Sequence, residues 1–228
     1  MRILIFILAF LTLPVFAQEG KVTTAGTFDR IILDGAVEVQ LRQGDRDEVA
    51  VAADSESQEV EIRISNGRLM VHDTGSWRFW NKSRPKVEVR VRNLRELIIS
   101  GASDVYAAGP FKSETLTLHI SGTGLVRFDA LEAENLRFII SGAGDGQLAG
   151  KVENLRLLVS GKGKVQADQL RATNAAVQIS GVGNAQLWVT DILKIGVSGV
   201  GTVDYWGQPQ VSRSSTGLAT VNARGEKR

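Results

Sequence analysis

The sequence contains no cysteine, only four prolines and few aromatic residues. Without cysteine there are no disulfides, and thiol chemistry and cysteine-bound metals are excluded. The 27 lysines and arginines outnumber the 25 aspartates and glutamates by two, which is too even a balance to indicate a nucleic-acid partner. After residue 17 no apolar run is long enough to cross a membrane. The chain must therefore build its stability from a non-covalent core.

The first seventeen residues are typical of a signal peptide. Arg2 supplies a positive charge, the run from Ile3 to Leu13 is almost entirely apolar, and Pro14 breaks any helix. Val15-Phe16-Ala17 then forms a cleavage site, and the apolar run is short for a membrane anchor. We predict that residues 1–17 are removed and that residues 18–228 are exported to the periplasm or to the cell surface, in association with the outer membrane.

A Ser-Gly dipeptide recurs every 18 to 21 residues in the second half of the chain. The six copies are Ser100-Gly101, Ser121-Gly122, Ser141-Gly142, Ser160-Gly161, Ser180-Gly181 and Ser198-Gly199. Five of them continue as Ser-Gly-x-Gly. A fixed period of this length indicates a stacked repeat architecture, and the glycines suit a sharp corner that needs positive φ or close backbone approach.

Aligning the copies on the serine reveals apolar columns at alternating positions. The residue one before the serine is Ile or Val in all six copies, and the residue three before it is apolar in all six. Positions five and seven after it are also mostly apolar. Period-two alternation predicts strands, and a twenty-residue unit can bury such columns only against identical neighbours. The predicted fold is all-β, a right-handed parallel β-helix (solenoid) of about 20-residue coils.

The N-terminal part departs from this period. Residues 22–92 contain longer alternating strands, such as Val60-Ile62-Ile64 and Val87-Val89-Val91, with a hairpin turn at Ser65-Asn66-Gly67. No Pro- or Ser-rich linker separates them from the repeats. We therefore predict a single domain over residues 18–228, in which residues 22–92 form a wider β layer and residues 93–222 form regular Ser-Gly coils.

These motifs resemble a known bacterial family. The matching features are Phe28-Asp29-Arg30-Ile31, Asp34-Gly35-Ala36-Val37, the serial Ile-Ser-Gly-x-Gly motif and the segment from Val203 to Pro209. Over roughly residues 22–222 the chain resembles the head GIN domain family, named for the heads of autotransporter adhesins. The resemblance implies a β-helical fold in an exported protein. It implies adhesion as a class, and it carries over neither a ligand nor catalytic residues.

No residue set predicts catalysis, a cofactor or a metal. The glycines lack the spacing and the Lys-Ser or Lys-Thr of a phosphate-binding loop. Six equivalent serines cannot all be nucleophiles, so we interpret the Ser-Gly copies as a structural turn ladder. His72 and His119 are far apart and lack partner ligands. Asp104 and Asp145 stand two coils, about 10 Å, apart, a spacing that would suit an inverting carboxylate pair, but Leu125 between them argues against a polar cleft.

Two features are candidate binding sites. The first is the aromatic and basic segment Trp77, Arg78, Phe79, Trp80 and Lys82, which would stack on sugars or peptides or, alternatively, cap the solenoid. The second is the row four residues before each serine, which contains Arg137, Arg156 and Lys194 with Glu96, Thr117 and Ala176. Its cations would meet anionic glycans or lipid head groups, or would simply protect the sheet from aggregation.

The sequence therefore favours a non-enzymatic envelope or surface protein that binds a glycan or an envelope or surface protein. The first alternative is a periplasmic structural or regulatory partner of an envelope system. The second is a polysaccharide-active β-helix enzyme, which is less favoured because the fold alone implies no chemistry. The oligomeric state is left open.

Overall fold

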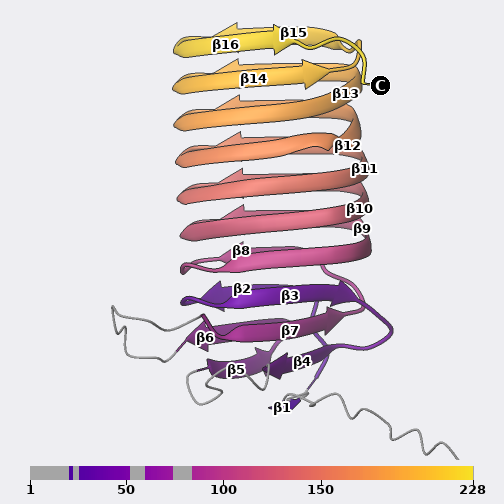
Figure 1. The fold of residues 1–228 in the computed structure, drawn as a ribbon, viewed down its shortest axis with the longest axis vertical. Helices are drawn as coiled ribbons and strands as arrows, with labels where there is room; N and C mark the ends of the chain where they lie inside the picture. Colours follow the sequence, from indigo (N-terminus) through magenta and orange to yellow (C-terminus); the bar gives the residue numbers. More distant parts are fainter. Residues whose placement is uncertain (1–20, 23–25, 52–59, 74–83, 228) are drawn as a thin grey trace, which may run out of the picture.

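The computed structural model describes residues 21–22, 26–51, 60–73 and 84–227, and among these it contains strands and no helix. All sixteen strands join one sheet that winds into a solenoid. In Figure 1 the chain crosses the near side from left to right while it climbs, so the winding is right-handed. The prediction of an all-β parallel solenoid with coils of about twenty residues is confirmed.

Five consecutive strands form the regular coils. They are β9 (Asp104–Ile120), β10 (Thr123–Ile140), β11 (Ala143–Val159), β12 (Lys162–Ile179) and β13 (Val182–Val197). Each coil pairs in parallel with the next. The strands are 16 to 18 residues long because the ladder of hydrogen bonds continues around the corners, where the register shifts at bulges. Only the Ser-Gly turn interrupts the ladder.

The N-terminal strands are shorter, with two to six residues each. They are β1 (Lys21–Val22), β2 (Arg30–Asp34), β3 (Glu38–Gln43), β4 (Glu48–Val51), β5 (Val60–Ser65), β6 (Arg68–Asp73), β7 (Lys86–Val91) and β8 (Glu96–Ile99). β2 and β3 continue the parallel stack below the coils, whereas β4 and β5 pair antiparallel with their neighbours. The alternating strands predicted over Val60–Ile64 and Val87–Val91 are found as β5 and β7, but they are shorter than the strands of the regular coils, because reversals of chain direction divide this part into pieces.

The hairpin predicted at residues 65–67 is confirmed. β5 and β6 pair antiparallel through Ser65 and Arg68, and the two residues between them have positive φ, 51° at Asn66 and 72° at Gly67. Two consecutive positive φ values define the type I′ turn that matches the twist of a two-residue hairpin.

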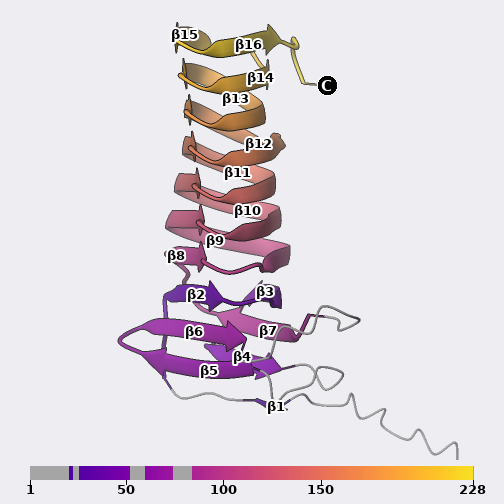
Figure 2. The same cartoon turned by 90° about the vertical axis from the view of Figure 1, so that its left-hand side faces the viewer.

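Three strands complete the C-terminal end: β14 (Val200–Trp206), β15 (Gln210–Ser215) and β16 (Leu218–Ala223). β15 stacks on β13 and β16 stacks on β14. Figure 2 shows both strands as the last layer of the solenoid, with the C-terminal tail descending beside it.

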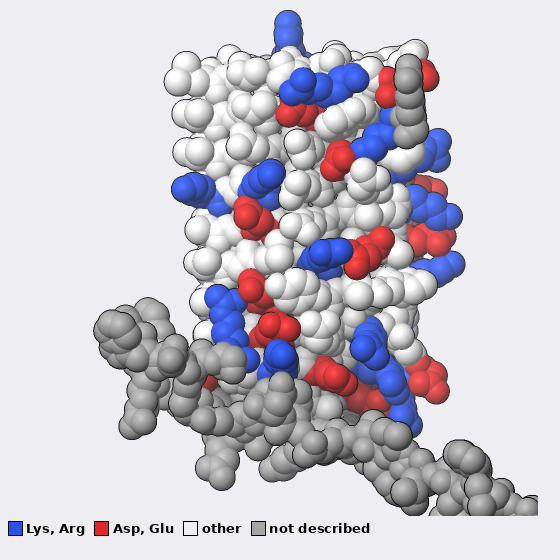
Figure 3. Space-filling view, in the orientation of Figure 1, with Lys and Arg blue, Asp and Glu red and all other residues white. Residues whose placement is uncertain are grey.

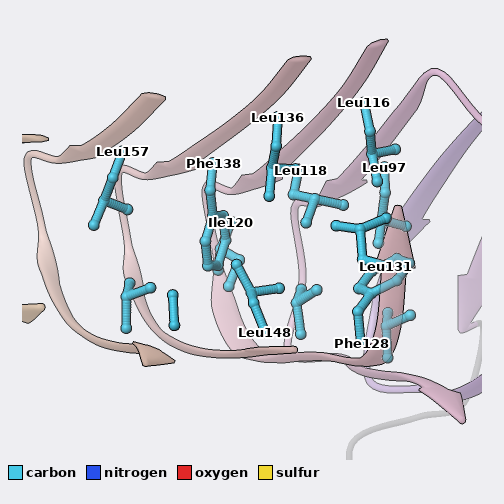
Figure 4. Packing of buried hydrophobic residues seen from close by; sticks show 14 of the residues in the cluster. Leu97, Leu116, Leu118, Ile120, Phe128, Leu131, Leu136, Phe138, Leu148 and Leu157 are labelled. Carbon is cyan, nitrogen blue, oxygen red and sulfur yellow. The ribbon is translucent and has the colours of Figure 1, made fainter. Parts of the chain in front are cut away.

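The interior is a continuous column of apolar side chains. The predicted inward positions one and three before each serine are buried in all six coils, as in Ile140 and Phe138. Figure 4 shows side chains of this wall, such as Phe138 and Leu118, facing Phe128 and Leu148 from the opposite wall. A third short side, which lies beyond the bulge and which the serine alignment did not mark, adds residues such as Phe111, Leu131 and Leu170. Burial of this continuous column provides the main stabilisation of a chain without disulfides.

Candidate binding surface

In the coils β9 to β13, one outer side of the solenoid carries cations without acids, and in β8 (Glu96–Ile99) below them Glu96 continues the same column. This outer side is formed by the last third of each of β9 to β13, on the side away from the viewer in Figure 1. We define its basic face as three outward columns that stand four residues before, two residues before and at the serine. From the bottom coil upward these columns contain Thr117, His119 and Ser121; Arg137, Ile139 and Ser141; Arg156, Leu158 and Ser160; Ala176, Gln178 and Ser180; and Lys194, Gly196 and Ser198.

The three cations of the basic face are available to a ligand. Arg137 and Arg156 are directly opposed in neighbouring coils, and Lys194 lies two coils above Arg156 in the same column. All three side chains are exposed, and within the part of the chain that the structure describes none of them has an ion-pair partner. Stacked like charges repel one another, so an anionic ligand that lies along the column would relieve that repulsion.

The acids of these coils lie around the next corner. A ladder of asparagines separates them from the basic face: Asn154 Nδ2 donates to Asn135 Oδ1, and Asn174 Nδ2 donates to Asn154 Oδ1, each at 3.2 Å. Beyond it, Glu134 and Glu153 are exposed. The surface is therefore segregated by charge across one corner of the coil.

A half-buried apolar column runs beside the cations. In register from the N-terminal end it contains Met70, Ile32, Ile98, His119, Ile139 and Leu158. His119 interrupts it, and its Nε2 lies 3.1 Å from the Ser141 hydroxyl. Within the basic face, Ile139 and Leu158 form a short apolar strip between the cations and the serine hydroxyls, and the column continues above them as Gln178 and Gly196. A surface of this kind suits an extended ligand that has both anionic and apolar parts.

The serines of the six Ser-Gly turns are exposed at the edge of the basic face. The hydroxyls of Ser121 and Ser160 donate to the carbonyl oxygens of Ile99 and Ile140 in the coil below, at 3.2 and 3.5 Å. Their bonds therefore run to the backbone of the neighbouring coil. Each hydroxyl oxygen can still accept a bond from a ligand.

The glycines of these turns are required by close packing. A Cβ built on Gly122, Gly142 or Gly161 would overlap the carbonyl oxygen of the corresponding glycine one coil below. The same holds for Gly181 and Gly199. None of these five has positive φ, so close backbone approach is the reason for glycine.

The two aspartates considered for catalysis lie on the opposite side of the solenoid. Asp104 Oδ1 accepts from the amide of Leu125, and Asp145 Oδ1 accepts from the amide of Lys164, each at 2.9 Å. Asp104 Oδ2 also accepts from Arg84 at 2.7 Å. Each carboxylate therefore accepts a hydrogen bond from the backbone of the next coil and fixes its position. The described residues contain no group of three or more His, Asp or Glu that would hold a metal ion.

The aromatic segment Trp77, Arg78, Phe79, Trp80 and Lys82 lies outside the described residues. Its role as a ligand site or a cap therefore stays a prediction from the sequence.

A charged ladder that the serine alignment did not reveal runs along the third side. Glu132 lies between Lys112 and Lys151 of the adjacent coils, and its two carboxylate oxygens are each 3.1 Å from one of the Nζ atoms. Hydrogen bonds from Lys151 and Lys112 hold the pKa of Glu132 below its usual value. In Figure 3 acids and bases alternate along the right-hand edge of the molecule. Because its charges already compensate one another, this ladder is a weaker candidate for a ligand than the basic face.

Comparison with known proteins supports the architecture. The family model described as "Putative auto-transporter adhesin, head GIN domain" matches residues 27–209. Comparison with curated proteins finds no match. Within the described residues there is no helix that is long and apolar enough to cross a membrane.

Solved structures share the fold at low sequence identity. A putative adhesin from Bacteroides fragilis has a TM-score of 0.80 at 20% identity, over 89% of this chain and 95% of that one. A putative lipid binding protein from Parabacteroides distasonis has a TM-score of 0.68 at 20% identity, over 89% and 95%. A putative adhesin from Parabacteroides merdae has a TM-score of 0.62 at 22% identity, over 91% and 95%. At these identities the likeness establishes the fold alone.

Proposed function

Because the chain belongs to the head GIN domain family of putative auto-transporter adhesins, we propose that it is an exported, non-enzymatic binding module of the cell envelope or cell surface. The signal peptide predicted over residues 1–17 supports export. The adhesin names of the family and of two structural neighbours support a binding role.

The observation that carries the proposal is the basic face. It combines unpaired cations, an apolar strip and a row of hydroxyls on a rigid sheet whose coils repeat about every 4.8 Å. A repeating ligand, such as an anionic glycan, can make the same contact on successive coils, and many weak contacts then add up. The acidic surface of an envelope or surface protein has the same complementary charge.

The non-enzymatic part of the proposal has its own support. Asp104 and Asp145 are the carboxylate pair that the sequence suggested for catalysis, and both are engaged by backbone amides of neighbouring coils. A polysaccharide-active enzyme would need a carboxyl group free to exchange protons with its substrate. Incubation with acidic polysaccharides should therefore yield no shortened products; products that disappear on replacement of Asp104 or Asp145 would contradict this part.

The first experiment is protease shaving of intact cells with fractionation of the envelope. Accessible protein on intact cells is the expected result for a surface adhesion module. Protein that is protected until the outer membrane is opened would contradict surface adhesion and would favour the alternative, a periplasmic partner of an envelope system. The predicted export stands in both cases, and retention in the cytoplasm would contradict it.

The second experiment tests the basic face. The triple variant Arg137→Glu/Arg156→Glu/Lys194→Glu should weaken binding to acidic glycans or to cell envelopes about tenfold or more, because it reverses three unpaired charges. The matched control is Lys162→Glu/Lys164→Glu/Arg127→Glu on the opposite side, which makes the same change in net charge. Equal loss in both variants would indicate a net-charge effect and would contradict the assignment of the face.

The aromatic segment is tested separately. If Trp77 and Trp80 contact the ligand, Trp77→Ala/Trp80→Ala should lower affinity while the unfolding transition stays unchanged. Unchanged binding would eliminate the segment as a ligand site and leave the basic face as the proposed one.

A further inference from the structure

We propose that the free edge of β16 is a docking site for a strand of another polypeptide, which adds in parallel to the end of the solenoid. This inference is independent of the basic face, because β16 lies on the opposite side of the coil.

Half of the backbone N–H and C=O groups of β16 have no partner strand among the described residues. Among the described strands β16 pairs with β14 alone, and the amides of Leu218 and Arg224 donate downward to the carbonyl oxygens of Gly199 and Tyr205 at 2.9 and 2.8 Å. In a parallel ladder each residue directs both its N–H and its C=O to the same side, and successive residues alternate. Residues 218, 220 and 222 therefore bond downward, and the N–H and C=O groups of Ala219, Val221 and Ala223 point out of the stack. An open edge of this kind is a template for an additional strand.

Apolar side chains at the beginning of β16 and of the strands below it are exposed to solvent. Val182, Val200 and Leu218 stack in one column and are 54%, 49% and 75% exposed. All five large apolar side chains that are exposed among the described residues lie between positions 182 and 218. Figure 3 shows no charged side chain at the upper left corner of the molecule, where Figure 1 places the beginnings of β14 and β16. An added strand would extend the column by one residue and cover Leu218.

The inward positions of β16 set the chemistry of the partner. Ala219 and Ala223 are small and Val221 is only partly buried, so the core below is thinly covered. Large aliphatic side chains on the inward side of an added strand would fill this layer. β16 itself has no charged residue. The partner is therefore an uncharged extended segment with aliphatic side chains at alternate positions.

A second copy of this chain does not fit. β15 forms the rest of the same terminal layer, and its register with β13 places Arg213 above Ile195, in an inward column. Two copies stacked end to end would bury two guanidinium groups in a joined core, which is strongly unfavourable. Arg213 therefore disfavours stacking of a second copy on the edge of β15, whereas β16 has no charged residue that would disfavour an added strand.

Neither the tail of the chain nor a lipid fits the edge. The Gly207 amide donates to the Gly225 carbonyl at 2.9 Å, and Lys227 Nζ lies 2.6 Å from Asp168 Oδ2, so residues 224–227 run down the side of the solenoid. An acyl chain could cover Leu218 but would leave the backbone groups of Ala219 and Val221 without partners.

The test uses a peptide with the sequence of residues 182–188, VGNAQLW, in which valine replaces Gly183 and leucine replaces Ala185 at the inward positions, capped at both ends. The parent segment is uncharged and already stacks in the same columns directly beneath β14. Titrated into the isotope-labelled mature protein to millimolar concentration, it should give saturable NMR shifts confined to the end of the solenoid. It should also slow amide exchange at Ala219, Val221 and Ala223 several-fold. Absence of these effects, or shifts elsewhere only, would overturn the proposal.

Two variants and one chemical control make the test specific. Val221→Pro removes an amide that has no partner in the ladder, so the protein should stay folded while peptide affinity falls about tenfold or more. Arg213→Pro makes the equivalent change on the edge of β15 and should leave affinity unchanged. N-methylation of the peptide at the positions of Asn184 and Gln186 should abolish binding, because these amides would face β16, whereas methylation at the positions of Ala185 and Leu187 should not. Binding that survives Val221→Pro and N-methylation alike would overturn strand addition.

Self-association and lipid binding are the competing outcomes. Sedimentation of the mature protein should reveal no dimer that forms through the edge of β16. A dimer that is lost in the Val221→Pro variant would mean that the occupant is a second copy, and it would overturn the proposal. Binding to phosphatidylglycerol vesicles that Leu218→Ser abolishes and Val221→Pro does not would mean that the occupant is a lipid, and it would likewise overturn the proposal.

Discussion

The ring of Phe138 occupies the space that a side chain at position 146 would need. A Cβ built on Gly146 would overlap Cε1 of Phe138, which points across the core from β10 toward β11. In the other coils the column of Gly146 contains Val or Ala, and the column of Phe138 contains Leu, Val or Ile. The large residue in one column and the absent side chain in the other therefore compensate.

This relationship predicts coupling between the two positions. Gly146→Val alone should destabilise the protein by about 1–3 kcal/mol through overpacking, and Phe138→Leu alone by about 1–2 kcal/mol through a cavity. The double variant restores the pattern of the other coils, so its stability should exceed the additive expectation by about 1 kcal/mol or more. Urea denaturation of the four proteins measures the coupling, and effects that add within about 0.5 kcal/mol would refute it.

The turn ladder predicts that its glycines are irreplaceable. Gly161→Ala should destabilise by about 3 kcal/mol or more, because the new Cβ overlaps the Gly142 carbonyl oxygen and the neighbouring coil cannot move alone. Gly109 is the matched control, since a Cβ there meets nothing within 4 Å, and Gly109→Ala should stay within about 1 kcal/mol of the parent. Equal midpoints of thermal unfolding for the two variants would contradict the close-approach explanation.

The asparagine ladder predicts a stabilising substitution. Asn174 Oδ1 is buried and has no hydrogen-bond partner within the described part of the chain. The next position in its column is Ile192, which is 38% exposed and cannot donate. Ile192→Asn should extend the ladder by one amide and raise the free energy of unfolding by about 1 kcal/mol. Ile192→Ala, which cannot donate either, is the control. Equal free energies of unfolding for the two variants in urea would show that the unpaired Oδ1 atom of Asn174 does not lower the stability of the parent protein.

A buried carboxylate predicts a pH dependence. Asp47 is 4% exposed in its side chain and accepts from the amide, Nε and Nη2 of Arg92. Burial by itself would raise the pKa of Asp47, but the hydrogen bonds from Arg92 outweigh it and hold the pKa below its usual value. A lowered pKa in the folded state means that the stabilisation is fully present above the ordinary carboxyl pKa near 4 and is lost as the pH falls through the lowered value.

Asp47→Asn should therefore be less stable than the parent at pH 6, and the difference should shrink progressively below about pH 4. Denaturation in urea between pH 2.5 and 7 measures it. Asp45→Asn, at an exposed neighbouring site with no ion-pair partner among the described residues, should follow the parent profile throughout. A constant difference between Asp47→Asn and the parent across this range would show that the carboxylate charge is not responsible.

The repeat was visible in the sequence because its signal is local. The residues next to each Ser-Gly turn alternate with period two, so their inward or outward direction follows from the pleat alone. The columns of Ile140 and Phe138 and the row of Arg137, Arg156 and Lys194 could therefore be predicted from the sequence. The prediction did not extend past the bulge in each coil, where the register shifts. The third side, with Leu131, Leu170 and the ladder of Lys112, Glu132 and Lys151, was therefore missed.

By itself the sequence determined the period, the inward columns and the even charge balance, because each is a property of residues close together in the chain. Tertiary structure alone decided which columns face one another, as Phe138 and Gly146 do across the core. It also decided that the unpaired cations share one side of the coils β9 to β13, where no acid accompanies them, and that Arg213 stands in an inward column of a layer where β16 has an open edge. These relationships join residues on different sides or in different layers of the solenoid, and they arise only when the winding brings those residues together.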